Sequence, residues 1–258
     1  MTPFVRKWVF ETLYKNRYLY RFASTVPFAG QWRVWQRLIL PRLVGHDVLE
    51  LGCGLGDLLA DMLADGYACR AVEHSPEMVA AARDTLQRRS VGEKNCIIQG
   101  SAQHLPFSDA SFDSVVSTFP SEYIYDPDTI AEVERVLRPG GRLIVIEGAN
   151  LLPVGFLQPV LLLFHLFVYG PSTLFEPRKQ GSSQEPVTHN AQPEPLENRR
   201  DNRLYINRDT GTGTTTEVLP DAWFGTHIPL EQFGLRRRSE CVRSRRWEVY
   251  ITIGEKIS

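Results

Sequence analysis

Val48-Leu-Glu-Leu-Gly-Cys-Gly-Leu-Gly-Asp57 is the stretch that decides the fold of this 258-residue chain. A short apolar run ends in three closely spaced glycines, and apolar residues at helical spacing follow over residues 55–63. Glycine tolerates positive φ and lets a ligand approach the backbone closely, and the start of the next helix offers free N–H groups. The pattern predicts a strand, a tight ligand-binding turn and a helix.

Strand and helix patterns alternate from residue 47 to residue 148, which predicts parallel strands joined by right-handed crossovers. Near the end of the chain, residues 235–246 and 249–253 have the pattern of an antiparallel hairpin. The expected fold class is therefore α/β, a Rossmann-like doubly wound seven-stranded sheet that is mostly parallel with a C-terminal antiparallel hairpin. The other predicted strands are 47–51, 69–73, 95–99, 112–118 and 142–147, and the other predicted helices are 76–87 and 126–137.

The charges around the glycine turn distinguish between two kinds of cofactor. The dinucleotide fingerprint is GxGxxG, whereas the glycines here have the spacing GxGxG and Asp57 occupies the next position. Glu50 precedes the turn, and two carboxylates would repel a pyrophosphate while suiting an amino group and a sulfonium cation. Glu73 ends the second predicted strand, 21 residues beyond Gly52, where a carboxylate can accept both hydroxyls of a ribose.

Five stretches in this order carry a family resemblance: residues 50–56 (ELGCGLG), 73–75 (EHS), 100–107 (GSAQHLPF), 112–116 (FDSVV) and 137–141 (LRPGG). They resemble the motifs of class I S-adenosylmethionine-dependent methyltransferases, in the methyltransferase type 11 branch that methylates quinones and phospholipid precursors. The resemblance implies S-adenosylmethionine as cofactor. One departure is Ser101, where the family often has an acidic residue that contacts adenine. The cofactor-binding residues implied are Glu50, Gly52, Cys53, Gly54, Gly56, Asp57, Glu73, His74, Ser101, Ala102, Gln103 and Ser117.

The acceptor side is expected beyond the carboxyl ends of the strands. Residues 118–123 (TFPSEY) lack the [DN]PPY signature with which some methyltransferases hold a planar amine, so base methylation loses support. Glu122 and Tyr123 are candidate acceptor-side groups and His104 is a candidate base, but the catalytic residue stays unassigned. The alternatives are that Tyr123 packs in the core and that Glu122 and His104 face solvent.

Three segments lie outside the alternating pattern. Residues 1–46 form an aromatic, basic helical arm that either caps the cofactor cleft or lies on anionic lipid. The apolar segment 149–175 is expected to be a lid over the acceptor pocket, a segment in contact with a bilayer interface, or a core helix. Residues 176–217 are polar and predict a mobile insertion. The methyltransferase domain is taken as residues 47–258, with the six arginines between 236 and 246 facing outward.

Composition limits the function further. The net charge of −1 gives no argument for a nucleic-acid partner, and four scattered cysteines without a CxxC pair argue against a disulfide framework and against a metal site. Charged residues interrupt the N-terminal segment, which argues against a secretory signal, so a cytoplasmic protein is expected, with membrane association left open. The function expected is methyl transfer to a lipophilic small molecule. RNA or protein methylation, and a non-enzymatic cofactor-binding or membrane-surface role, remain alternatives.

Overall fold

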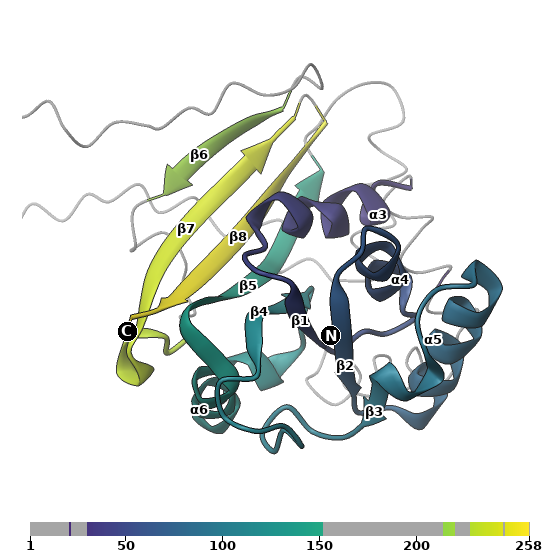
Figure 1. Ribbon diagram of the computed structural model, residues 1–258. Coiled ribbons are helices and arrows are strands. Elements are labelled where there is room, and N and C mark those ends of the chain that lie inside the picture. Colours follow the sequence, from purple (N-terminus) through teal and green to yellow (C-terminus); the bar gives the residue numbers. More distant parts are fainter. Residues whose placement is uncertain (1–20, 22–29, 152–213, 220–227, 245, 258) are drawn as a thin grey trace, which may run out of the picture.

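The computed structural model describes residue 21 and residues 30–151, 214–219, 228–244 and 246–257. Within these residues one twisted sheet of eight strands runs in the order β3-β2-β1-β4-β5-β8-β7-β6 (Figure 1). Strands β1 to β5 pair in parallel, and β6, β7 and β8 pair antiparallel at one side. The strands are β1 Asp47–Leu51, β2 Ala68–Glu73, β3 Ile97–Gln99, β4 Phe112–Thr118, β5 Leu137–Leu151, β6 Thr215–Leu219, β7 Leu235–Arg243 and β8 Trp247–Lys256.

Helices cover both faces of this sheet. Core residues of η1, α4 and α5 pack with one face, and core residues of α6 pack with the other. Alternation along β1 explains this arrangement, because Val48 belongs to the first core cluster and Leu49 to the second. The helices are α3 Gln31–Gln36, η1 Arg37–Arg42, α4 Asp57–Ala64, α5 Pro76–Arg89, η2 Lys94–Cys96, η3 Glu122–Tyr125, α6 Pro127–Val136 and η6 Glu231–Phe233.

Local sequence signals set where the two longest helices begin. Ser75 and Asp126 are N-caps whose side chains accept hydrogen bonds from the backbone N–H of Met78 and Asp128. A proline stands at the first helical position of both α5 and α6, where the missing N–H has no partner to lose. Capping and proline placement therefore fix where α5 leaves the end of β2 and where α6 begins after η3.

The predicted fold class is confirmed, and the strand count and several boundaries differ. Thr215–Leu219 forms β6 at the sheet edge, so the sheet has eight strands and residues 215–217 do not belong to the predicted insertion. Strand β5 continues through Leu151 because β8 pairs with it along its length. Residues 149–151 are therefore strand rather than the start of an apolar lid. The rest of the predicted lid, 152–175, lies outside the described residues.

Candidate functional site

The glycine turn lies between β1 and α4. Gly52, Gly54 and Gly56 all have positive φ, at 69°, 53° and 73°. A Cβ at Gly56 would come within 2.8 Å of the Ala82 Cβ, so this glycine lets the turn pack against α5. The Gly52 N–H donates to the Val72 carbonyl at 2.8 Å, which ties the turn to the end of β2. The glycines at 52, 54 and 56 are thus explained by the positive φ that all three have and by the close approach of the turn to β2 and α5.

Glu73 fixes the turn from the end of β2. Its Oε2 accepts a hydrogen bond from the Gly54 N–H at 2.9 Å, and its Oε1 accepts one from the Ser75 N–H at 2.9 Å. The residue is 6% exposed. A carboxylate oxygen has a second lone pair, so each oxygen can also receive a ribose hydroxyl. Glu73 therefore anchors the turn and remains chemically suited to a ribose.

Glu50 is a buried acid next to the turn. Burial, and to a smaller extent the neighbouring Glu73, raise the pKa of its carboxyl to about 8, while Arg33 opposes the rise. Its Oε2 has no hydrogen-bond partner among the described residues. The expectation that Glu50 and Asp57 carry two negative charges beside the turn is therefore corrected. At neutral pH Glu50 is largely protonated because a carboxylate would be desolvated there.

Helix α3 closes over the turn. Side chains of Trp32, Arg33 and Gln36 line a cavity that they share with residues 52–55, Asp57 and Thr118. The cavity measures about 60 Å³, well below the roughly 300–1,000 Å³ typical of small-molecule sites. Glycines of the turn line this cavity, and the Glu73 carboxylate adjoins it by accepting the Gly54 N–H. Close backbone approach and an adjoining carboxylate suit an adenosyl cofactor chemically.

Two sets of contacts hold α3 in place. The Trp32 ring stacks on Phe119 with centroids 4.1 Å apart, and Gln36 Nε2 donates to Thr118 Oγ1 at 3.3 Å. Phe119 has a φ of 52°, a left-handed backbone that costs a bulky residue energy and is often found at ligand sites. Gln36, Thr118 and Phe119 carry no sequence motif, and the basic, aromatic character of the arm was the only signal for Trp32.

A second anchor of α3 is Asp61 on α4. Arg33, Arg37 and Arg89 all form ion pairs with its carboxylate, whose side chain is 2% exposed. The three guanidinium groups come from α3, η1 and α5. Of the predicted arm, residues 30–42 lie beside the glycine turn and α4, and its role as a cap of the cofactor cleft stays a prediction. Nearly all of 1–29 lies outside the described residues; within it, Arg21 lies 3.4 Å from the Asp57 carboxylate.

The loop after β3 holds the predicted adenine-side residues. Ser101 Oγ donates to Gln103 Oε1, and Gln103 Nε2 donates to Asp126 Oδ2 at 3.0 Å. Ser101, Ala102 and Gln103 are all partly exposed. These three residues lie together in one turn. Their side-chain hydrogen bonds stay within the turn, except for the one from Gln103 to Asp126, the N-cap of α6.

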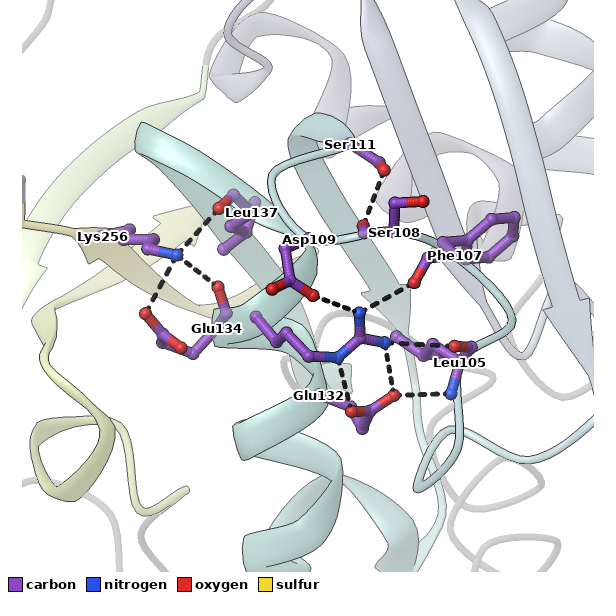
Figure 2. Close-up of polar contacts among 10 residues, drawn as sticks. Leu105, Phe107, Ser108, Asp109, Ser111, Glu132, Glu134, Leu137 and Lys256 are labelled. Atoms are coloured by element: carbon purple, nitrogen blue, oxygen red, sulfur yellow. Dashed lines mark hydrogen bonds and ion pairs between the residues drawn. The ribbon is translucent and has the colours of Figure 1, made fainter.

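Arg135 of α6 clamps the continuation of this loop. Figure 2 labels its partners Leu105, Phe107, Asp109 and Glu132. Its guanidinium donates to the carbonyls of Leu105 and Phe107 at 3.1 and 2.8 Å, and pairs with Glu132 and Asp109. The Glu132 Oε2 also accepts from the Leu105 N–H at 2.7 Å. The hydrogen bond from Arg135 lowers the pKa of Glu132, so this clamp stays charged. The loop is thus preorganised by α6 rather than by its own sequence.

The predicted acceptor-side groups separate into two environments. The Tyr123 hydroxyl donates to the Leu51 carbonyl at 3.1 Å and lies 2.6 Å from Ser117 Oγ, which is itself 3.1 Å from that carbonyl. Ser117 is fully buried, so both hydroxyls support the end of β1. Glu122, His104 and His74 are exposed. Tyr123 therefore packs against the core, as the alternative interpretation had it, and its hydroxyl lies close to Gly52.

The arginines of the C-terminal hairpin are not all outward. The Arg237 side chain is 5% exposed and donates to Glu231 and to the Ile228 carbonyl. Side chains alternate along β7, so Arg237 points to the same face as Leu235, which belongs to the core cluster under α6.

Among the described residues, no helix has the length and apolar character needed to cross a bilayer.

Comparisons with known proteins agree with this geometry. Residues 49–145 match the family model described as a methyltransferase domain. The demethylmenaquinone methyltransferase of Corynebacterium glutamicum (strain R) is 34% identical over 149 residues, covering 56% of this chain and 60% of the relative. The ubiquinone/menaquinone biosynthesis C-methyltransferase of Cellvibrio japonicus is 30% identical over 135 residues, covering 50% and 54%. The chain thus spans little more than half the length of these curated relatives.

A solved structure supports the fold. The PH0226 protein from Pyrococcus horikoshii OT3 matches with a TM-score of 0.50 and 18% identity, over 89% of this chain and 91% of that one. S-adenosylmethionine is the methyl donor that the family implies. Residues 49–145 are therefore similar in sequence to the methyltransferase domain family and distantly similar to the quinone methyltransferases, and the fold agrees with that similarity.

Proposed function

We propose that this protein transfers a methyl group from S-adenosylmethionine to a lipophilic small molecule of the quinone, phospholipid or polyketide type. The observation that carries the proposal is the glycine turn held by Glu73 at the carboxyl edge of the parallel strands, where α/β folds bind ligands. The similarity to a demethylmenaquinone methyltransferase and to a ubiquinone/menaquinone biosynthesis C-methyltransferase favours a quinone-like acceptor.

When bound, the cofactor would supply a methyl group attached to a sulfonium sulfur; the S–CH3 bond breaks as the methyl carbon goes to the acceptor, and the sulfur leaves as the neutral thioether of S-adenosylhomocysteine. The chain's own task is therefore alignment, which can contribute about 7–11 kcal/mol when reacting groups are well oriented. Glu73 is suited to the ribose hydroxyls, the turn at Ser101–Gln103 to the adenine, and Gly52 and Gly54 to a close approach of the backbone. Asp57 and the N-terminus of α4 flank the same turn.

An apolar acceptor suits the rim of the cleft. Trp32 and Phe119 form a stacked aromatic pair at its edge, and aromatic faces favour flat conjugated rings. A proton leaving the acceptor needs a base, for which His104 and Glu122 remain candidates as exposed groups. The Tyr123 hydroxyl is engaged with Leu51 and Ser117, so we propose a supporting role for Tyr123.

The test is a methyl-transfer assay with radiolabelled S-adenosylmethionine. The protein is incubated separately with a demethylated quinol in detergent, with phospholipid and polyketide probes, with total RNA and with a protein extract. The proposal expects label in the organic phase with at least one of the lipophilic acceptors and not with RNA or protein, and its loss in Gly54→Val. Label incorporated only into RNA or protein, or none with any acceptor class including phospholipid and polyketide probes, would overturn it.

A further inference from the structure

A second and larger cavity lies away from the glycine turn. It measures about 410 Å³ and is bounded by η1 on one side and by strands β5 to β8 on the other. No residue lining it also lines the cavity beside the glycine turn. Its volume falls within the roughly 300–1,000 Å³ range of small-molecule sites.

The register of the sheet gathers charged residues on the floor of this cavity. Arg142 of β5 pairs with Glu255 of β8, which pairs with Arg236 of β7. Paired residues share a face, and alternate residues along a strand share it too. Arg238 and Glu240 of β7 therefore lie on the same face as Arg236, beneath η1.

The arginines of this cavity outnumber their acidic partners. Arg42 donates through Nε to Glu240 Oε2 at 2.8 Å, and Arg238 donates to the other oxygen of the same carboxylate. Glu255 accepts from Arg236 at 3.1 Å, with the Arg142 Nη2 at 3.9 Å. Arg237 also borders the cavity, but its charge is paired with Glu231. The other four arginines (42, 142, 236 and 238) face two glutamates (240 and 255), which leaves a local charge of +2.

Part of this arginine set has donors to spare. The Arg142 Nε is buried and has no hydrogen-bond partner among the described residues. The side chains of Arg236 and Arg238 are 67% and 58% exposed, so a ligand can reach their guanidinium groups. Arginine presents its donors in a planar fork that matches phosphate oxygens.

We propose that this cavity is a second ligand site, which binds the phosphate group of a small amphipathic phosphoester. A phosphomonoester carries about −1.5 to −2 charges at pH 7, which matches the local charge of +2. Pro41, Val218, Leu219 and Ile253 line the same cavity and suit the apolar part of such a molecule.

The site is separate from the cofactor turn along the strands as well. Arg142 pairs with Ser114, which pairs with Val48, so these three residues form one row near the amino ends of β5, β4 and β1. The glycine turn follows the carboxyl end of β1. A phosphoester in the second cavity therefore does not compete with the cofactor.

Calorimetry of the full chain with inorganic phosphate and with glycerol 3-phosphate tests the proposal, at constant ionic strength in chloride. The expected result is saturable binding that weakens about tenfold or more in Arg142→Gln/Arg236→Gln, because charge-assisted hydrogen bonds are lost. Arg142→Lys keeps the charge but loses the fork, so an intermediate loss is expected. Arg88→Gln on α5, which removes one exposed arginine elsewhere, is the control and leaves binding unchanged.

Vesicle flotation separates the two sources of the phosphate group. Binding to phosphatidic acid vesicles but not to phosphatidylcholine vesicles indicates a lipid headgroup, and binding of glycerol 3-phosphate alone indicates a free phosphoester; either supports the site if it depends on Arg142 and Arg236. No phosphate binding, equal binding by the double variant, or an equal loss of S-adenosylhomocysteine binding in that variant would overturn the proposal.

Discussion

The Gly54 amide donates a hydrogen bond to Glu73 Oε2 at 2.9 Å, which joins the glycine turn to the end of the neighbouring strand. The other carboxylate oxygen accepts from the Ser75 N–H at the cap of α5. One side chain thus organises the backbone on both sides of the cleft. Any substitution of Glu73 acts on the turn as well as on a ligand.

The two roles of Glu73 can be separated by comparing Glu73→Ala with Glu73→Gln. Alanine leaves the buried Gly54 amide and the partly buried Ser75 amide without an acceptor. A buried amide without a partner costs about 1–3 kcal/mol, so a clear fall in the free energy of unfolding is expected. Glutamine keeps one acceptor oxygen and the side-chain volume, so a smaller loss is expected. Urea denaturation measures both.

Affinity provides the second readout of Glu73. Glu73→Gln is expected to weaken S-adenosylhomocysteine binding at least tenfold, because a charge-assisted hydrogen bond contributes about 1.5–3 kcal/mol. Glu93→Gln, an exposed acid before η2, is the control. A folded Glu73→Gln protein with unchanged affinity would assign Glu73 a structural role alone.

Glu50 is expected to make stability depend on pH. Its pKa rises from an ordinary 4.5 to about 8 through burial, so between these values the folded state holds a proton that the unfolded state has released. The free energy of unfolding therefore falls as pH rises through this window, by up to about 1.4 kcal/mol per pH unit. Glu50→Gln should remove this contribution.

Urea denaturation of wild type and Glu50→Gln at pH 5 to 8.5 measures this contribution as the difference between their free energies of unfolding at each pH. The variant is expected to gain stability relative to wild type as pH rises, and Glu93→Gln is expected to follow the wild-type curve. Parallel curves for Glu50→Gln and wild type would show that the Glu50 carboxyl is solvated.

The Asp61 cluster is expected to hold α3 over the cleft. Asp61→Asn removes a buried charge that pairs with three arginines, whereas Asp84→Asn removes an exposed pair with Arg88. Because exposed pairs contribute about 0–1 kcal/mol, only Asp61→Asn should speed amide exchange over residues 31–42. Equal exchange in both variants would place the restraint on α3 elsewhere.

Arg135 is expected to preorganise the loop at residues 105–109. Arg135→Lys keeps a charge but cannot reach Leu105, Phe107, Glu132 and Asp109 together. We expect a loss of about 1–3 kcal/mol in the free energy of unfolding. Arg88→Lys at its exposed pair is the control, and losses of equal size in the two variants would contradict the clamp.

The sequence predicted the centre of the fold better than its edges. Strands 47–51 and 112–118 were predicted with the bounds that the structure gives, because buried runs between glycines and polar residues leave little choice. Thr215–Leu219 has a mixed, half-exposed pattern inside a polar stretch, so only its pairing with β7 identifies it as a strand.

The candidate site was predicted in its motifs and missed in its long-range contacts. The glycine turn, Glu73 and the loop at 100–107 follow from local patterns. The closure by Trp32 and Phe119 joins residues 87 positions apart, and the raised pKa of Glu50 depends on burial by several elements. Such contacts have no local signature in a single sequence.

Calorimetric titration of the full chain with S-adenosylhomocysteine and, separately, with NAD tests the central claim most directly. The account predicts saturable binding of S-adenosylhomocysteine, its loss in Gly54→Val, and no response to NAD. Gly66→Val is the matched control, because Gly66 also has positive φ but an added Cβ there meets no described atom within 4 Å. Binding of NAD without any response to S-adenosylhomocysteine would contradict the account.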